Sequence, residues 1–149
     1  MKRYHFIAIG GSAMHSLAIA LKENGDQISG SDDAIFDPSK TQLLKAAIYP
    51  EKMGWHPEKI STDLDAVILG MHAKADNPEL ITAQSLGLKI YSYPEFIAHF
   101  SKRKTRVVIA GSHGKTTISA MVLHVLKYHD RSVDFMLGAQ LDGYNNSVS

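Results

Sequence analysis

Residues 107–117 constrain the fold of this chain more than any other segment, and they read Val-Val-Ile-Ala-Gly-Ser-His-Gly-Lys-Thr-Thr. A β-branched apolar run leads into a turn of small residues, and a helix-like segment follows at once. A strand, a glycine-rich turn and a helix in this order form a cradle for phosphate, because backbone N–H groups and the positive end of the helix face the anion. The apolar positions that mark one face of this helix are Ile118, Met121, Val122, Val125 and Leu126.

The Gly-Lys-Thr sequence that closes this turn indicates a site for a nucleoside triphosphate. We expect Lys115 to reach the terminal phosphates and the hydroxyl of Thr116 to bind Mg²⁺. Ile109 stands where the full pattern has its first glycine, so the loop is shorter than that of a GTPase. An ordinary glycine-rich turn is the alternative interpretation. The residues predicted to contact the triphosphate are Gly111, Ser112, His113, Gly114, Lys115, Thr116 and Thr117.

A second turn of the same kind lies near the N-terminus. The apolar run 6–9 precedes Gly-Gly-Ser-Ala at 10–13, and a helix is expected over 13–24. In the frame of the dinucleotide fingerprint G-x-G-x-x-G, Gly10 is the middle glycine, alanines take the other two positions, and Asp32 follows about twenty residues on. A match this degraded is weak evidence for a nucleotide site when it stands alone. Two nucleotide-type loops in tandem are a more specific signal than either loop by itself.

Strands and helices alternate along the chain, which predicts an α/β fold with a doubly wound parallel sheet. The basic segment 101–106 marks the expected boundary between a domain at 1–103 and the beginning of a second domain at 104–149. The second domain is expected to contain a strand, a phosphate loop, a helix and a further strand, and to be cut short. The expected strands are 6–9, 27–30, 66–69, 89–91, 107–110 and 133–137, and the expected helices of the first domain are 13–24, 38–47, 77–87 and 94–100.

The composition narrows the classes of partner and compartment. The chain has 149 residues and no cysteine, which excludes disulfides and cysteine-based metal sites. Its eight histidines show no metal-ligand spacing, and a net charge of +1 favours no nucleic acid. No stretch is long and apolar enough for a signal peptide or a membrane span, so we expect a soluble, cytoplasmic protein that does not bind a membrane.

Several short motifs resemble the Mur ligases of bacterial cell-wall synthesis, in particular the branch that contains MurC and Mpl. Residues 5–14 read His-Phe-Ile-Ala-Ile-Gly-Gly-Ser-Ala-Met, 30–32 read Gly-Ser-Asp, and 76–80 read Asp-Asn-Pro-Glu-Leu. His113 inside the phosphate loop is also typical of this branch. Ala8 and Ala13, which replace glycines of the family pattern, are departures from it.

The resemblance implies a Rossmann-like domain for a UDP-sugar, followed by a P-loop ATPase domain. It implies ATP with Mg²⁺, and amide-bond formation on UDP-N-acetylmuramate through an acyl phosphate. The incoming amine is L-alanine or a recycled L-Ala-D-Glu-meso-diaminopimelate tripeptide, and the fragment does not separate the two. Lys115 and His113 are the expected catalytic residues, although His113 has a purely structural alternative. The fragment alone is expected to be inactive.

The residues expected to contact the UDP-sugar each have a plainer alternative. The glycines of the first turn also suit a turn without a ligand, and Ser31 and Asp32 suit a helix cap. His72 is either a uracil contact or an exposed loop histidine, and a cap is the more favoured reading of Asn77. The expected contacts are Gly10, Gly11, Ser12, Ala13, Met14, Ser31, Asp32, His72 and Asn77.

Two other functions fit parts of the sequence. A non-catalytic, NAD-sensing regulatory module would use the first turn and Asp32, and a P-loop GTPase or kinase would use the second turn. Packing is the role expected of the aromatic residues Phe36, Trp55, Phe96 and Phe100.

Overall fold

The computed structural model describes residues 1–71, 73–137 and 148. The chain divides into two compact units, Met1–Lys102 and Arg103–Ser149, which are described separately. No described helix is both long and apolar enough to cross a membrane.

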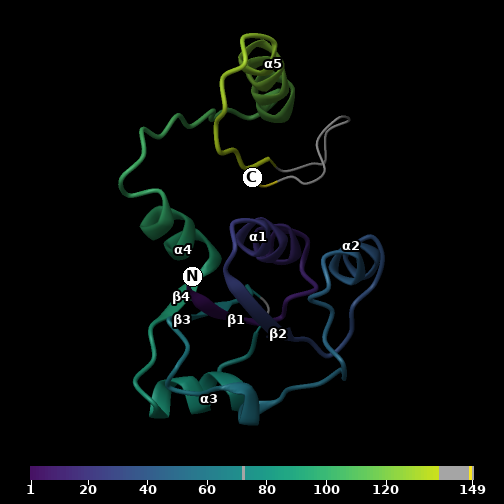
Figure 1. The fold of residues 1–149 in the computed structure, drawn as a ribbon, viewed down its shortest axis with the longest axis vertical. Coiled ribbons are helices and arrows are strands. Elements are labelled where there is room, and N and C mark those ends of the chain that lie inside the picture. Colours follow the sequence, from purple (N-terminus) through teal and green to yellow (C-terminus); the bar gives the residue numbers. More distant parts are fainter. Residues whose placement is uncertain (72, 138–147, 149) are drawn as a thin grey trace. The chain divides into compact units, whose positions relative to one another are not determined.

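The first unit is built on a four-stranded parallel sheet (Figure 1). Its strands are β1 (Arg3–Ile7), β2 (Gln27–Ser31), β3 (Ala66–Leu69) and β4 (Ile90–Ser92), in the order β2-β1-β3-β4. The predicted α/β class with a parallel sheet is therefore confirmed. The chain leaves β1 toward β2 on one side and later returns to β3 on the other. In such a sheet, ligands bind in the crevice beyond the carboxyl ends of the two strands where the winding reverses, here β1 and β3.

Helices cover both faces of this sheet. Figure 1 shows α1 (Ser12–Glu23) and α4 (Tyr93–Phe100) on one face and α3 (Pro78–Ser85) on the other. The helix α2 (Ser39–Lys45) packs beside α1, and a short 3₁₀ turn, η1 (Pro57–Lys59), packs against α3. Connections of this kind place every β-to-α turn at the same edge of the sheet.

The core follows the two-residue period of the strands. Ile7 and Val67 point toward α3 and form a buried cluster with the side chains of that helix and of the segment before β3. On the opposite face, the ring of Tyr4 meets that of Phe96 edge-on, with 5.2 Å between ring centroids. Burial on both faces explains why β3 is a continuous apolar run. The other members of the α3-side cluster are Ile60, Leu64, Leu80 and Ala83.

In its described residues, the second unit contains one helix, α5 (Lys115–Tyr128), directly after the predicted phosphate loop. The strands predicted at 107–110 and 133–137 are not formed, and Val107 is 83% exposed. A strand of a parallel sheet needs a neighbouring strand, and the described residues of this unit supply none apart from an isolated bridge between Met136 and Val148. For the same reason the predicted apolar face of α5 is largely uncovered, with Met121 63% exposed. Among the described residues of α5, Leu123 alone is buried.

Candidate functional site

The turn between β1 and α1 has a specific backbone geometry. Ala8 adopts a left-handed conformation with φ of 65°, at a position where the fingerprint has glycine. The Gly10 N–H donates to Asp32 Oδ2 at 2.7 Å, and the Gly11 N–H donates a longer bond to the Ala8 carbonyl at 3.4 Å. The turn is therefore closed by a carboxylate from the end of β2.

The five predicted contacts in this turn, at residues 10–14, differ in whether their backbone amides already have an acceptor. The Gly10 and Gly11 amides donate within the turn, so in this structure they are not free to face a pyrophosphate. At the start of α1, the amides of Ser12, Ala13 and Met14 donate to no acceptor within the described part of the chain. Three free N–H groups at a helix N-terminus form the part of this turn that attracts negative charge.

Gly10 is required by close packing. A Cβ at this position would lie 2.8 Å from Ile35 Cγ1 and 2.9 Å from Asp32 Oδ2. Both neighbours are buried, so neither has room to move away. Gly11 is less confined, since a Cβ there would meet its nearest atom, Met14 Cγ, at 3.5 Å. The first glycine thus admits the Asp32 carboxylate to the backbone of the turn.

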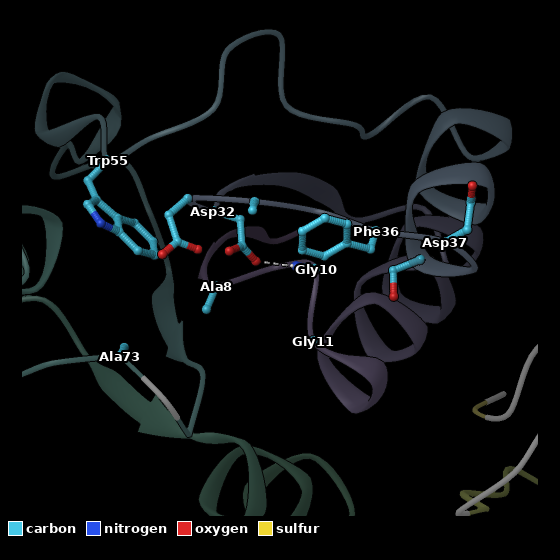
Figure 2. A pocket seen from close by; sticks show the side chains of 11 residues that line it. Ala8, Gly10, Gly11, Asp32, Phe36, Asp37, Trp55 and Ala73 are labelled. Atoms are coloured by element: carbon cyan, nitrogen blue, oxygen red, sulfur yellow. Dashed lines mark hydrogen bonds between the residues drawn. The ribbon is translucent and has the colours of Figure 1, made fainter.

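Beside the turn lies a pocket of about 360 Å³ at the carboxyl edge of the sheet (Figure 2). Trp55 and Phe36 contribute aromatic surface to its wall, and Phe36 is 77% exposed. The assignment of Phe36 to packing was wrong, and Trp55 has a second role besides packing on the α3-side cluster. The remaining lining residues are Ala8, Gly10, Gly11, Asp32, Asp33, Ala34, Asp37, Ser39 and Ala73.

The charge of this pocket decides what can enter it. Asp32, Asp33 and Asp37 line it, and none of the described lining residues is Lys or Arg. Burial raises the pKa of Asp32, a hydrogen bond with Asp33 adds to that rise, and the Gly10 amide opposes it. Carboxylates accept hydrogen bonds from hydroxyl and N–H groups but repel phosphate. The pocket therefore suits a sugar or a base, while phosphate is favoured only at the start of α1.

The other residues predicted to bind the UDP-sugar are placed differently. Ser31 is fully buried, and its hydroxyl makes no hydrogen bond of ordinary geometry to the described residues. Asn77 is 4% exposed and caps α3, since its Oδ1 accepts the N–H groups of Glu79 and Leu80 at 2.9 and 3.2 Å. The Met14 side chain is buried, which leaves only its amide available. His72 lies outside the described residues.

A buried network of polar side chains on the α3 side of the sheet was not predicted from the sequence. Glu79 and His5 are both fully buried, with 3.3 Å between Glu79 Oε2 and His5 Nε2. The other oxygen, Glu79 Oε1, accepts the His56 N–H at 2.6 Å. Burial alone would raise the pKa of Glu79, but the hydrogen bonds from His5 and the His56 amide, with the nearby Ser31 hydroxyl, outweigh it and lower that pKa. An acid in the first turn of a helix is common, so the sequence carried no signal of these long-range partners.

In the second unit, the predicted phosphate loop is exposed, and its N–H groups have no hydrogen-bond acceptor among the described residues. Gly114 caps α5 with φ of 75°. The ammonium group of Lys115 folds onto the loop and donates to the Gly111 carbonyl at 2.6 Å. His113 Nδ1 lies 3.2 Å from Ser112 Oγ. Within the described residues, the N–H groups from Ser112 to Thr117 donate to no acceptor, so this segment fits an anion.

The chemistry of the loop also suits a magnesium-bound triphosphate. Thr116 follows the lysine directly and offers a hydroxyl oxygen, the kind of ligand that Mg²⁺ accepts. The described residues contain no group of three or more His, Cys, Asp or Glu side chains that could hold a metal ion. In nucleotide sites, Mg²⁺ generally keeps several water ligands and is shared with the phosphates.

Comparisons with known proteins cover both units. The family model described as "Mur ligase family, catalytic domain" matches residues 3–105. The UDP-N-acetylmuramate–L-alanine ligase of Carboxydothermus hydrogenoformans is 34% identical over 147 residues, which is 97% of this chain and 31% of that protein. Its counterpart from Clostridium acetobutylicum is 36% identical over 151 residues, 99% of this chain and 32% of that protein. The chain thus spans about a third of the length of these curated relatives.

Solved structures of Mur ligases also match this chain over nearly its whole length. The UDP-N-acetylmuramate:L-alanyl-γ-D-glutamyl-meso-diaminopimelate ligase (Mpl) from Neisseria meningitides matches with a TM-score of 0.83 and 31% identity, over 99% of this chain and 46% of that one. The UDP-N-acetylmuramate–alanine ligase MurC from Thermotoga maritima matches with a TM-score of 0.83 and 28% identity, over 99% of this chain and 34% of that one.

Proposed function

The chain belongs to the Mur ligase family, and from that membership we propose that it carries the UDP-N-acetylmuramate site and the phosphate loop of an ATP-dependent ligase of peptidoglycan synthesis. The observation that most supports this proposal is the extent of the likeness. It runs through both units and reaches proteins named for UDP-N-acetylmuramate. If the similarity covered the first unit alone, it would not support the proposed role of the phosphate loop.

In this proposal the first unit holds the UDP-sugar. The free amides of Ser12, Ala13 and Met14 take the pyrophosphate at the start of α1. The neighbouring acidic pocket takes the uridine, whose hydroxyl and N–H groups donate to carboxylates such as Asp33. Asp32 supports the turn through Gly10.

The second unit holds ATP in the same proposal. The loop amides and Lys115 bind the phosphates, and the Thr116 hydroxyl binds Mg²⁺. When bound, ATP supplies the phosphoryl group that activates a carboxylate, and Mg²⁺ neutralises phosphate charge. In this proposal Lys115 contributes a positive charge at the transferred group, and His113 contacts that group or the sugar's carboxylate.

The proposed reaction joins the carboxylate of UDP-N-acetylmuramate to an amine. Phosphoryl transfer to the carboxylate oxygen gives an acyl phosphate and ADP. The amine of L-alanine or of the tripeptide then attacks the carbonyl carbon, and the C–O bond to phosphate breaks. The amine loses a proton and inorganic phosphate leaves. We propose that this reaction takes place in the cytoplasm.

Isothermal titration calorimetry of the 149-residue chain tests the binding part of the proposal. We expect saturable binding of UDP-N-acetylmuramate and no binding of NAD⁺. NAD⁺ is the matched ligand because a regulatory module of the dinucleotide-binding kind would prefer it. Binding of NAD⁺ without binding of the UDP-sugar would overturn the proposed function. The fragment is expected to form no amide even with all substrates present.

A further inference from the structure

The sequence contains a single tryptophan, and hydrogen bonds from two backbone N–H groups hold the segment on either side of it. The Gly54 N–H donates to the Asp32 carbonyl at 2.7 Å, and the His56 N–H donates to Glu79 Oε1 at 2.6 Å. Trp55 lies between these two residues. It lines the pocket, and it also packs against the buried cluster beneath the sheet. Figure 2 shows its indole at the wall of the pocket.

The second of these anchors comes from an unusual group. The Glu79 carboxylate has no exposed surface, and a buried charge is costly unless donors surround it. His5 Nε2 lies 3.3 Å from Glu79 Oε2, and His5 Nδ1 lies 2.9 Å from Ser29 Oγ. This chain of contacts fixes the carboxylate with one oxygen toward β1 and the other toward the Trp55 segment.

The helix that carries Glu79 does not need this carboxylate in order to begin. Asn77 already caps α3 by accepting two of its first N–H groups. Pro78 at the first helical position suits the start of the helix as well. The carboxylate instead reaches a loop residue 23 positions earlier in the chain. The hydrogen bond from the His56 N–H to this carboxylate therefore stabilises the loop and is not needed for the start of the helix.

From this geometry we infer that Glu79 is a positioning residue, which sets the tryptophan wall of the pocket by holding the backbone next to Trp55. The identity of the ligand in this statement rests on the proposed function, whereas the anchoring of Trp55 does not. Without the acceptor, the His56 amide would lose its partner, and the Gly54 bond to Asp32 would be the remaining long-range backbone hydrogen bond beside Trp55 among the described residues. A ligand would then have to order the wall on binding, which weakens its apparent affinity.

Two substitutions of similar volume distinguish the effect of losing the hydrogen-bond acceptor from the effect of losing side-chain volume. Glu79→Gln keeps an oxygen for the His56 N–H, and its amide can donate to His5 Nε2 once that imidazole carries its proton on Nδ1. Glu79→Leu fills the same space without an acceptor. Leu80→Ala is the control for lost packing in the buried cluster that Trp55 also contacts, because the Leu80 side chain takes no part in the anchor.

The first measurement is acrylamide quenching of Trp55 in the unliganded chain. We expect Glu79→Leu to raise the quenching constant about twofold or more, and Glu79→Gln and Leu80→Ala to stay close to wild type. In calorimetry with UDP-N-acetylmuramate, Glu79→Leu should raise Kd about tenfold, against less than about threefold for Glu79→Gln. Unchanged quenching in Glu79→Leu, or an equal rise in Leu80→Ala, would overturn the inference.

The two proposals can fail separately. If the wild-type chain does not bind the UDP-sugar, the proposed function fails, and quenching still decides the role of Glu79. If Glu79→Leu does not fold, hydrogen exchange of the wild-type chain takes its place. The His56 amide should then exchange as slowly as amides of the central strands, and exchange as fast as that of an exposed loop amide would refute the anchor.

Discussion

The sharpest test of the first turn compares the same substitution at two adjacent glycines. Gly10→Ala places a Cβ 2.8 Å from Ile35 Cγ1 and 2.9 Å from Asp32 Oδ2, both of which are buried. Gly11→Ala places its Cβ no closer than 3.5 Å to the nearest atom. Neither glycine has a positive φ, so the two sites differ in space and not in backbone strain.

The size of the effect follows from these contacts. Overpacking a filled interior costs about 1–3 kcal/mol. Moving the Asp32 carboxylate away also weakens its 2.7 Å bond from the Gly10 amide, and a bond of this charged type contributes about 1.5–3 kcal/mol. Because the two costs overlap, we expect Gly10→Ala to lower the free energy of unfolding by about 2–4 kcal/mol. Gly11→Ala should stay within about 1 kcal/mol of wild type.

Thermal unfolding followed by Trp55 fluorescence measures this difference, because the sole tryptophan lies in the first unit. A loss of 2–4 kcal/mol corresponds to a fall in Tm of roughly 10–20 °C for a unit of this size. If Gly10→Ala melts within about 3 °C of Gly11→Ala, the close packing of Asp32 against the turn is refuted.

Three further predictions concern other features. Ala8→Gly relieves a left-handed φ of 65° but gives the unfolded chain more freedom, so we expect a net gain of about 0.5–1 kcal/mol in denaturant unfolding; a loss would contradict the strain. The pKa of Glu79 is lowered in the folded chain, so its contribution to stability is present above its ordinary pKa and is lost as the pH falls below about 4.5. Wild type should therefore lose more unfolding free energy than Glu79→Gln between about pH 5 and pH 3, and parallel curves would argue against this. Lys115→Ala should abolish ATP binding while leaving Kd for UDP-N-acetylmuramate within about twofold, and a large loss of UDP-sugar affinity would show that the two sites are not separate.

Local signals in the sequence located most of the first unit. The run 66–69 became β3 with the predicted bounds, because three of its four apolar residues are buried and helices cover both faces of the sheet. Asn77 and Pro78 marked the start of α3 because capping depends on residues close in sequence. The expected strand at 6–9 was displaced to Arg3–Ile7, since the chain leaves the sheet at the left-handed Ala8.

Features that depend on distant partners were not predicted. The Glu79 and His5 pair joins residues 74 positions apart, and Asp32 reaches Gly10 from 22 positions away. Contacts between such distant residues follow no periodic pattern, so a single sequence does not reveal them. The strands expected at 107–110 and 133–137 had suitable residues but found no neighbouring strand among the described residues, and pairing decides whether a strand forms.

We propose that this chain holds two separate anion sites, one at the start of α1 and one at the start of α5. Amide chemical shifts of the ¹⁵N-labelled chain test it directly, by titration first with UDP-N-acetylmuramate and then with a non-hydrolysable ATP analogue and Mg²⁺. We expect the UDP-sugar to shift the amides of Ser12, Ala13 and Met14, and the ATP analogue to shift those of residues 112–117. Shifts of one common set of amides by both ligands, or no shifts at either helix start, would contradict it.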